Sequence, residues 1–238
     1  MCHYERIFRR MRAVVYFSNT GESKKIAAYL AEKTGFPLRA LEECKETAFK
    51  RLILVFPVYC QNAPTPVCAF LKRTKSEGFT AVAIYGRMCY GNVLKELQKK
   101  YGEHHSFIAA AYVPTKHTYL AEESFLAFER LQPLVEKQGS DQKVDIPRSY
   151  KNPLANFAMG WRSRIGVKIV KNNRCIGCGL CERECVYKAM QNGKPNQKCV
   201  RCLRCVARCP AQALEFECRA SLKWYLKKKK IDDLVLYM

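Results

Sequence analysis

Two cysteine runs between residues 175 and 210 constrain this chain more than any other feature. Each run has the spacing C-x2-C-x2-C-x3-C, and Pro210 follows the second. The first run holds Cys175, Cys178, Cys181 and Cys185, and the second holds Cys199, Cys202, Cys205 and Cys209. An iron–sulfur cube needs several soft thiolates that converge on it, and short turns between cysteines can bring three sulfurs to one point. The spacing therefore predicts two cluster sites.

Zinc and disulfides are the competing interpretations of the same cysteines. Zinc ribbons use four cysteines in two C-x2-C pairs, not a tight run of three with a fourth, repeated twice. Disulfides require an oxidising compartment. The first residues, MCHYERIFRRMR, are basic and lead directly into a short apolar run, without the pattern of a secretion signal. The sequence therefore favours two [4Fe–4S] clusters and a cytoplasmic location.

Both runs resemble those of two-cluster bacterial ferredoxins, in which the fourth cysteine of each run binds the other cluster. The resemblance implies two crossed ligand sets. One set is Cys175, Cys178, Cys181 and Cys209, and the other is Cys199, Cys202, Cys205 and Cys185. Val186 stands where the first run of such ferredoxins usually has proline. Because proline is not a ligand, this departure removes no sulfur.

The chain has 238 residues, which leaves room for a second domain of ordinary size before the cysteine runs. Apolar segments typical of strands alternate there with amphipathic helical segments. The predicted strands are 13–17, 36–41, 51–56, 79–85 and 106–113, and the predicted helices are 22–34, 66–75, 92–101 and 121–137. This alternation indicates an α/β fold with a doubly wound, parallel five-stranded sheet, in the order 2-1-3-4-5.

The loop between the first strand and its helix carries the sequence SNTGES, residues 18–23. Backbone N–H groups at a helix N-terminus attract anions, and the hydroxyl groups of Ser18, Thr20 and Ser23 add donors. The loop has no built-in lysine of the kind that binds a nucleoside triphosphate. The loop therefore predicts a phosphate site, although an ordinary capped turn between strand and helix also fits.

Ser18-x-Thr20-Gly21-x-Ser23 is similar to the phosphate-binding loop of flavodoxins, which implies FMN. In this fold the flavin lies over the carboxyl ends of strands one, three and four. The implied FMN contacts come from three loops: Ser18, Asn19, Thr20, Gly21, Glu22 and Ser23; Pro57, Val58 and Tyr59; and Gly86, Tyr90, Gly91 and Asn92. Tyr59 and Tyr90 are the candidates to flank the flavin ring, and the alternative is that they only cover the end of the sheet.

A flavodoxin-like part followed by two ferredoxin runs resembles the family of flavodoxin–ferredoxin fusion proteins. The resemblance covers about 11–138 and 168–218. We predict a flavodoxin-like FMN-binding domain over 11–138, a connecting segment with a bridging helix over 139–167, a small α+β ferredoxin domain over 168–218, and a basic C-terminal tail over 219–238. The tail, with Lys227–Lys230, fits a helix with a charged face.

The formal net charge is +21, from 42 Lys and Arg against 21 Asp and Glu. Such a charge speeds association with acidic partners. No nucleic-acid-binding signature accompanies it, so no specific nucleic acid is expected. No segment has the apolar length of a membrane span.

The function expected from these features is electron transfer between FMN, the clusters and an acidic redox partner protein. The alternative is a flavin-dependent reductase of a small organic substrate, with a pocket near residues 113–119. A homodimer is expected if FMN and clusters of one chain lie too far apart.

Overall fold

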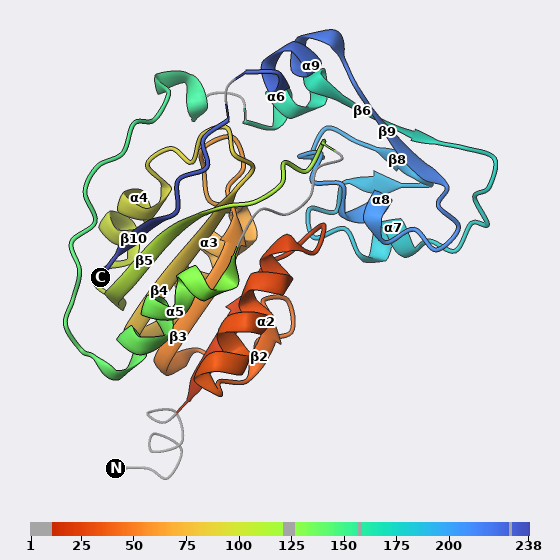
Figure 1. The fold of residues 1–238 in the computed structure, drawn as a ribbon. Helices are drawn as coiled ribbons and strands as arrows, with labels where there is room; N and C mark the ends of the chain where they lie inside the picture. The colour runs from red at the N-terminus through yellow and green to blue at the C-terminus, as the bar shows by residue number, and fades with distance from the viewer. Residues whose placement is uncertain (1–10, 121–126, 157–158, 229) are drawn as a thin grey trace. The chain divides into compact units, whose positions relative to one another are not determined.

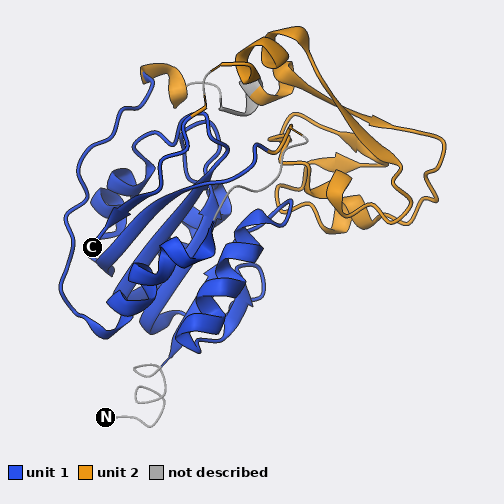
Figure 2. Cartoon of the chain, viewed as in Figure 1, with its two compact units in different colours: residues 1–117, 122–152, 231–238 blue, residues 118–121, 153–230 orange. Residues whose placement is uncertain are grey.

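The computed structural model describes residues 11–120, 127–156, 159–228 and 230–238, which fall into two compact units (Figure 2). The first unit comprises residues 1–117, 122–152 and 231–238, and the second comprises residues 118–121 and 153–230. The chain therefore contributes two segments to the second unit, 118–121 and 153–230, and ends in the first unit.

The first unit is built on a parallel sheet with the strand order β2-β1-β3-β4-β5, which confirms the predicted flavodoxin-like order. The strands are β1 (Arg12–Tyr16), β2 (Leu38–Ala40), β3 (Ala48–Pro57), β4 (Lys75–Tyr85) and β5 (His105–Pro114). β3, β4 and β5 are almost continuously buried, as expected for parallel strands that have helices on both faces.

Four helices cover this sheet, with α2 and α5 on its near face and α3 and α4 behind it in Figure 1. Their bounds are α2 (Glu22–Thr34), α3 (Thr65–Arg73), α4 (Val93–Tyr101) and α5 (Gln132–Glu136). The predicted helix over 121–137 is broken up: residues 121–126 lie outside the described residues, and α5 is flanked by the 3-10 turns η1 (Phe128–Leu131) and η2 (Lys137–Gly139). Pro133 stands in the first turn of α5, where its missing N–H costs little.

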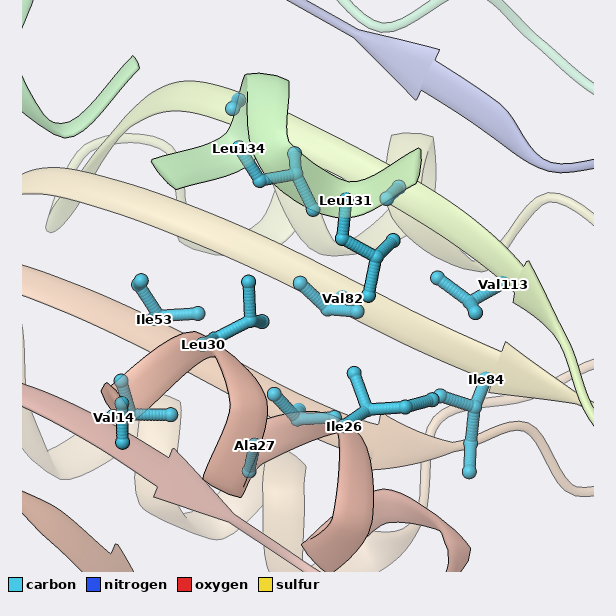
Figure 3. Packing of buried hydrophobic residues seen from close by; sticks show 14 residues of the cluster. Val14, Ile26, Ala27, Leu30, Ile53, Val82, Ile84, Val113, Leu131 and Leu134 are labelled. Atoms are coloured by element: carbon cyan, nitrogen blue, oxygen red, sulfur yellow. The ribbon is translucent and has the colours of Figure 1, made fainter. Parts of the chain in front are cut away.

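The core of the near face is made of aliphatic side chains from the sheet and from α2 (Figure 3). Ile26 and Leu30, one turn apart on α2, pack against Val14, Ile53 and Val82, and each of the five is at most 2% exposed. Full burial of such a side chain contributes about 1.5–3 kcal/mol. The 3.6-residue spacing on α2 is thus what fixes this helix to the sheet.

The C-terminal strand β10 (Val235–Tyr237) was not predicted. It pairs antiparallel with β5, with Leu236 opposite Ala111, and it makes the sheet six-stranded. The sequence predicts a basic tail over 219–238 that fits a helix with a charged face. The structure has a helix only at α9 (Ala220–Leu226), in the second unit. Leu234 and Leu236 pack against the core of the first unit, which explains why this end is a strand and not part of a charged helix.

The second unit is a small α+β arrangement. Its outer pair of strands, β6 (Val167–Lys171) and β9 (Leu214–Cys218), is antiparallel with Ile169 opposite Phe216. The other elements are η3 (Pro153–Ala155), α6 (Met159–Gly166), α7 (Leu180–Arg183), β7 (Met190–Gln191), β8 (Lys194–Pro195) and α8 (Arg204–Ala207).

The predicted connecting segment, 139–167, is divided between the units. Residues 140–152 have no regular structure and are bound to the first unit by hydrogen bonds, such as Val144 N–H to Phe107 C=O at 2.9 Å. Lys151 forms an ion pair with Glu96 at 2.7 Å. The helix expected here is α6, described over Met159–Gly166. Phe157, which belongs to the predicted connecting segment, lies outside the described residues.

No helix in the described ranges is both long and apolar enough to cross a membrane.

His105, at the start of β5, should make the stability of the protein depend on pH. Its Nε2 lies 3.0 Å from Leu71 C=O, so Nε2 carries the hydrogen and Nδ1 accepts the hydroxyl of Ser76 at 2.8 Å. Burial lowers the pKa of His105 below its ordinary value of 6.5. The unfolded chain therefore binds more protons, and the free energy of unfolding should fall as pH drops below about 6.5, by up to about 1.4 kcal/mol per pH unit.

Urea unfolding between neutral and mildly acidic pH measures this slope. His105→Gln should flatten it, whereas His104→Gln, at the exposed neighbouring position, should leave it unchanged. An equal slope in the wild type and His105→Gln would contradict the assignment.

Candidate functional site

Two cavities in the second unit are each lined by four of the eight cysteines. The first cavity contains Cys175, Cys178, Cys181 and Cys209. The second contains Cys199, Cys202, Cys205 and Cys185. The grouping is crossed: each run contributes its first three cysteines to one cavity and its fourth to the other. These are the same two sets that the sequence resemblance implies as cluster ligands.

The backbone explains how both runs make the same shape. Gly177 and Gly179 take left-handed φ values of 69° and 67°. The corresponding positions of the second run, 24 residues on, are Arg201 and Leu203, with φ values of 57° and 59°. Residues other than glycine rarely adopt this backbone conformation, which costs of the order of 1 kcal/mol or more per residue. The repeat therefore imposes one loop geometry on two different sequences.

The fourth cysteine of each run is held in the same way. Ala189 N–H donates to Cys185 Sγ, and Ala213 N–H donates to Cys209 Sγ, each at 3.2 Å. Donors of this kind stabilise negative charge on sulfur and lower the electron density that a bound metal receives.

Burial favours the protonated form of two thiols that line the second cavity, those of Cys202 and Cys205. It raises the pKa of Cys202 to about 11, and it raises the pKa of Cys205 to about 12, with the neighbouring thiols of Cys199 and Cys202 adding to the Cys205 shift. The thiols of Cys202 and Cys205 would thus stay neutral unless a cation replaces their protons. Iron does this when it binds thiolates, so the donor set fits a cluster.

No group of three or more His, Cys, Asp or Glu side chains within the described part of the chain is arranged to hold a single metal ion. In a [4Fe–4S] cube each cysteine binds a different iron. The ligands of a cube therefore stand further apart than those of one ion.

In the first unit, the three predicted FMN loops follow β1, β3 and β4, which are neighbours in the parallel sheet, so the loops meet at one edge. The loop after β1 leads directly into α2. Ser18, Asn19 and Ser23 are buried there, Thr20 is half-buried, and Gly21 has a φ of 104° with open space where a side chain would stand. Ser18 Oγ accepts Gly21 N–H at 3.2 Å.

Asn19 connects the first loop to the second. Its side-chain amide hydrogen-bonds the hydroxyl of Tyr59, and its Oδ1 atom is buried with no hydrogen-bond partner among the described residues. Asn19 is only 6% exposed. A buried polar atom without a partner is costly, and a ligand that completes its hydrogen bonding would remove that cost.

Two lysines that contact Glu22 bring positive charge to the same loop. Glu22 is 7% exposed and lies in the first turn of α2. Lys25 donates to its Oε1 at 3.0 Å, and Lys116, from the loop after β5, lies 3.7 Å from the same oxygen. Two lysines beside one buried carboxylate leave a net positive charge next to the predicted phosphate position. The sequence assigned residues 113–119 only to the substrate pocket of the alternative function.

The second loop turns tightly at residues 59–62. Tyr59 and Asn62 exchange two backbone hydrogen bonds of 2.9 Å, while Cys60 and Gln61 between them have φ values of 48° and 64°. Two positive φ values are the mark of a type I′ turn. Pro57 ends β3, and Val58 N–H donates to Ile84 C=O at 2.7 Å. The turn therefore holds Tyr59 at the edge where the first loop lies.

The third loop packs closely against its neighbours. A side chain at Gly86 would lie 2.7 Å from the ring of His117, and one at Gly91 would lie 2.5 Å from Cβ of Gln61. Asn92 precedes α4, and its side-chain oxygen accepts Ser149 N–H at 3.0 Å. These two glycines are what let the third loop approach His117 and the second loop.

Tyr90 belongs to an aromatic cluster of the protein itself. Its ring stacks on Tyr112 at 4.1 Å and meets the edge of Tyr85 at 5.1 Å. One face of the Tyr90 ring is thus already covered, which supports the alternative that Tyr90 packs over the sheet end. Tyr59 is then the better candidate to flank a flavin.

The C-terminal segment fixes the third loop, a feature that sequence reasoning missed. Arg87 forms a two-pronged ion pair with Asp232, and its C=O accepts Ile231 N–H at 2.7 Å. Tyr85 donates its hydroxyl to Asp233 C=O at 2.8 Å. The last residues of the chain therefore support one of the three candidate flavin loops.

No protein-family model matches the chain. Two uncharacterized proteins of Methanocaldococcus jannaschii match short stretches, one at 42% identity over 45 residues and one at 34% over 68 residues. These matches cover 18% and 28% of this chain, and the chain spans only 18% and 29% of the length of these relatives.

Among solved structures, a short-chain flavodoxin associated with a bacterial microcompartment is similar over 55% of this chain and 97% of its own, at 12% identity and a TM-score of 0.42. The rubredoxin:oxygen oxidoreductase of Desulfovibrio gigas is similar over 56% of this chain and 37% of its own, at 15% identity and a TM-score of 0.39. Likenesses this low carry no function across to this chain.

Proposed function

We propose that this protein is an iron–sulfur flavoprotein that transfers electrons between FMN, two [4Fe–4S] clusters and a redox partner protein. The observation that carries the proposal is the crossed grouping of eight cysteines in two cavities. Four thiolates in each cavity satisfy one cube, and no cysteine of either run is left over.

In this proposal the edge formed by the three loops holds FMN. The hydroxyls of Ser18 and Ser23 and the N-terminus of α2 bind the phosphate, and Asn19 and Tyr59 contact the ring side of the cofactor. FMN supplies a group that can take up one or two electrons, whereas each cluster takes one at a time. The chain's own contribution is to bind and orient these groups and to keep water from them.

The charge of the second unit supports an acidic partner. Residues 153–230 contain 18 Lys and Arg and four Asp and Glu. A field of this sign accelerates encounters with negatively charged proteins and weakens as salt is added.

Anaerobic purification followed by cofactor analysis tests the proposal. The expected result is about eight iron, about eight sulfide and one FMN per chain. Zinc in place of iron, or a protein that does not bind added FMN, would overturn it.

Lys116→Ala should weaken FMN binding by about fivefold, because it removes a cation that lies beside the phosphate loop. Titration of the apoprotein with FMN, followed by quenching of flavin fluorescence, measures the change. Riboflavin has no phosphate, so its affinity should be the same in the variant and the wild type. Lys99→Ala, an exposed lysine in the last turn of α4, is the matched control and should bind FMN normally. Equal loss of FMN and riboflavin binding would assign Lys116 to the fold of the loop and not to the phosphate.

A further inference from the structure

The two cysteine runs share spacing and backbone shape but differ in exposure. Cys175 and Cys178, from the first run, are exposed. Their counterparts in the second run are Cys199, which is buried, and Cys202, which is half-buried. Cys199 and Leu203 belong to the apolar core of the second unit, together with Val167 and Leu214. The first cavity therefore opens to the surface, and the second lies against the core.

Ile176 is the exposed apolar residue between the two exposed cysteines. It is 72% exposed, whereas its counterpart Val200 is half-buried and lines the second cavity. Residues 173–178 form one continuous exposed segment around it. A large apolar side chain at the mouth of a functional cavity is typical of the centre of a protein-binding surface, where its burial contributes to affinity.

The charges beside this segment are arranged for an acidic partner. Arg183 donates to Cys178 C=O at 2.8 Å, which places its guanidinium at the rim of the first cavity, and Lys171 lines the same cavity. Glu215 is paired with Arg174 at 3.1 Å. Glu182 also lines the first cavity, and its Oε1 accepts Asn192 N–H at 2.6 Å. Arg183 and Lys171 outnumber this carboxylate, so the rim keeps a net positive charge.

We propose that residues 173–178 are the docking surface for an acidic one-electron carrier protein, with Ile176 at its centre and the first cavity as the electron port. The proposal rests on the proposed function, because the port must hold a cluster. It adds that the two cavities have different roles: the first exchanges electrons with the partner, and the second lies within the unit.

The experiment measures binding and not turnover. The cluster-loaded protein is titrated anaerobically with a plant-type [2Fe–2S] ferredoxin, an acidic one-electron carrier, at low and at high ionic strength. The wild type should bind the probe, and added salt should weaken binding strongly. Ile176→Ser should weaken binding about tenfold at low salt. The matched control is Trp224→Ser, which changes another exposed apolar residue of the second unit, 68% exposed, and should leave the affinity within about twofold.

Iron and FMN are determined for every variant before the titration, so that the two proposals fail separately. A wild type without clusters would defeat the proposed function. Loaded variants in which Ile176→Ser binds as tightly as Trp224→Ser, or a loaded wild type that does not bind the probe, would defeat the docking surface alone. Sedimentation gives a further outcome: if Ile176→Ser converts a dimer into a monomer, a second copy of the chain covers this surface and the acidic-partner proposal is wrong.

Discussion

Replacing Cys209 with alanine should lower the iron content of the anaerobically purified protein from about eight to about four atoms per chain. Cys209 lies 28 residues or more beyond the other cysteines of the first cavity, yet it lines that cavity with them. Its loss should therefore empty the first cavity, although Cys209 belongs to the second run. Ala213 N–H would also lose its acceptor, Cys209 Sγ.

Alkylation of the variants identifies which cluster is lost. In Cys209→Ala, the thiols of Cys175, Cys178 and Cys181 should become reactive, and the protein should be labelled on the first run. In Cys185→Ala the newly labelled thiols should instead be Cys199, Cys202 and Cys205. Mass spectrometry of the labelled peptides identifies the alkylated cysteines in both variants.

Cys218→Ala is the matched control, since Cys218 lies in the same unit but lines neither cavity. It should keep about eight iron atoms per chain. If Cys209→Ala kept both clusters with unchanged spectra, or if it released the thiols of its own run, the crossed assignment would be wrong.

The crossed grouping could be anticipated from the sequence because the cysteine spacing is repeated without change. The solvent exposure of the cysteines in each run could not be anticipated from the sequence. Cys175 and Cys199 hold equivalent positions, but only Cys199 is surrounded by the apolar core of its unit. Likewise, Gly177 and Gly179 are residues that predict a left-handed backbone conformation. Arg201 and Leu203 take the same conformation although arginine and leucine rarely adopt it. Tertiary packing overrides local preference in the second run.

The parallel sheet could be predicted because each of its strands is a short apolar run followed by a helix with a 3.6-residue pattern. β10 escaped prediction because it has only three residues and follows a lysine-rich stretch. The contacts that hold it join residues far apart in the chain, such as Arg87 and Asp232, whose sequence separation is 145. A sequence pattern within a few residues cannot predict such a long-range contact.

The candidate flavin loops were likewise predictable from the sequence in one respect and not in another. Their place at the sheet edge followed from the strand order, but the direction of each side chain did not. Tyr90 turns to Tyr112, a residue of β5 whose position becomes known only when the strands are assembled. Lys116 reaches Glu22 across 94 positions of sequence for the same reason.

Gly91→Ala should weaken FMN binding at least about tenfold, which makes it the most damaging single change expected in the first unit. Gly91 has a φ of 66°, and a Cβ atom there would stand 2.5 Å from Cβ of Gln61 and 3.0 Å from its backbone oxygen. Backbone atoms of a tight turn cannot yield as a flexible side chain can. The second and third loops must therefore separate, and with them Tyr59 moves from the edge where Asn19 holds it.

Gly35→Ala separates the two causes of this loss. Gly35 ends α2 with a φ of 69°, but a side chain there would meet nothing within 4 Å. Both variants carry the strain of a left-handed alanine, about 1–2 kcal/mol, and only Gly91→Ala adds the clash. Flavin fluorescence titration of both apoproteins, with thermal unfolding measured alongside, should show a loss of stability in each, larger in Gly91→Ala, and a loss of FMN affinity in Gly91→Ala alone. If both variants bound FMN as well as the wild type, the contact between the second and third loops would have no part in holding the flavin.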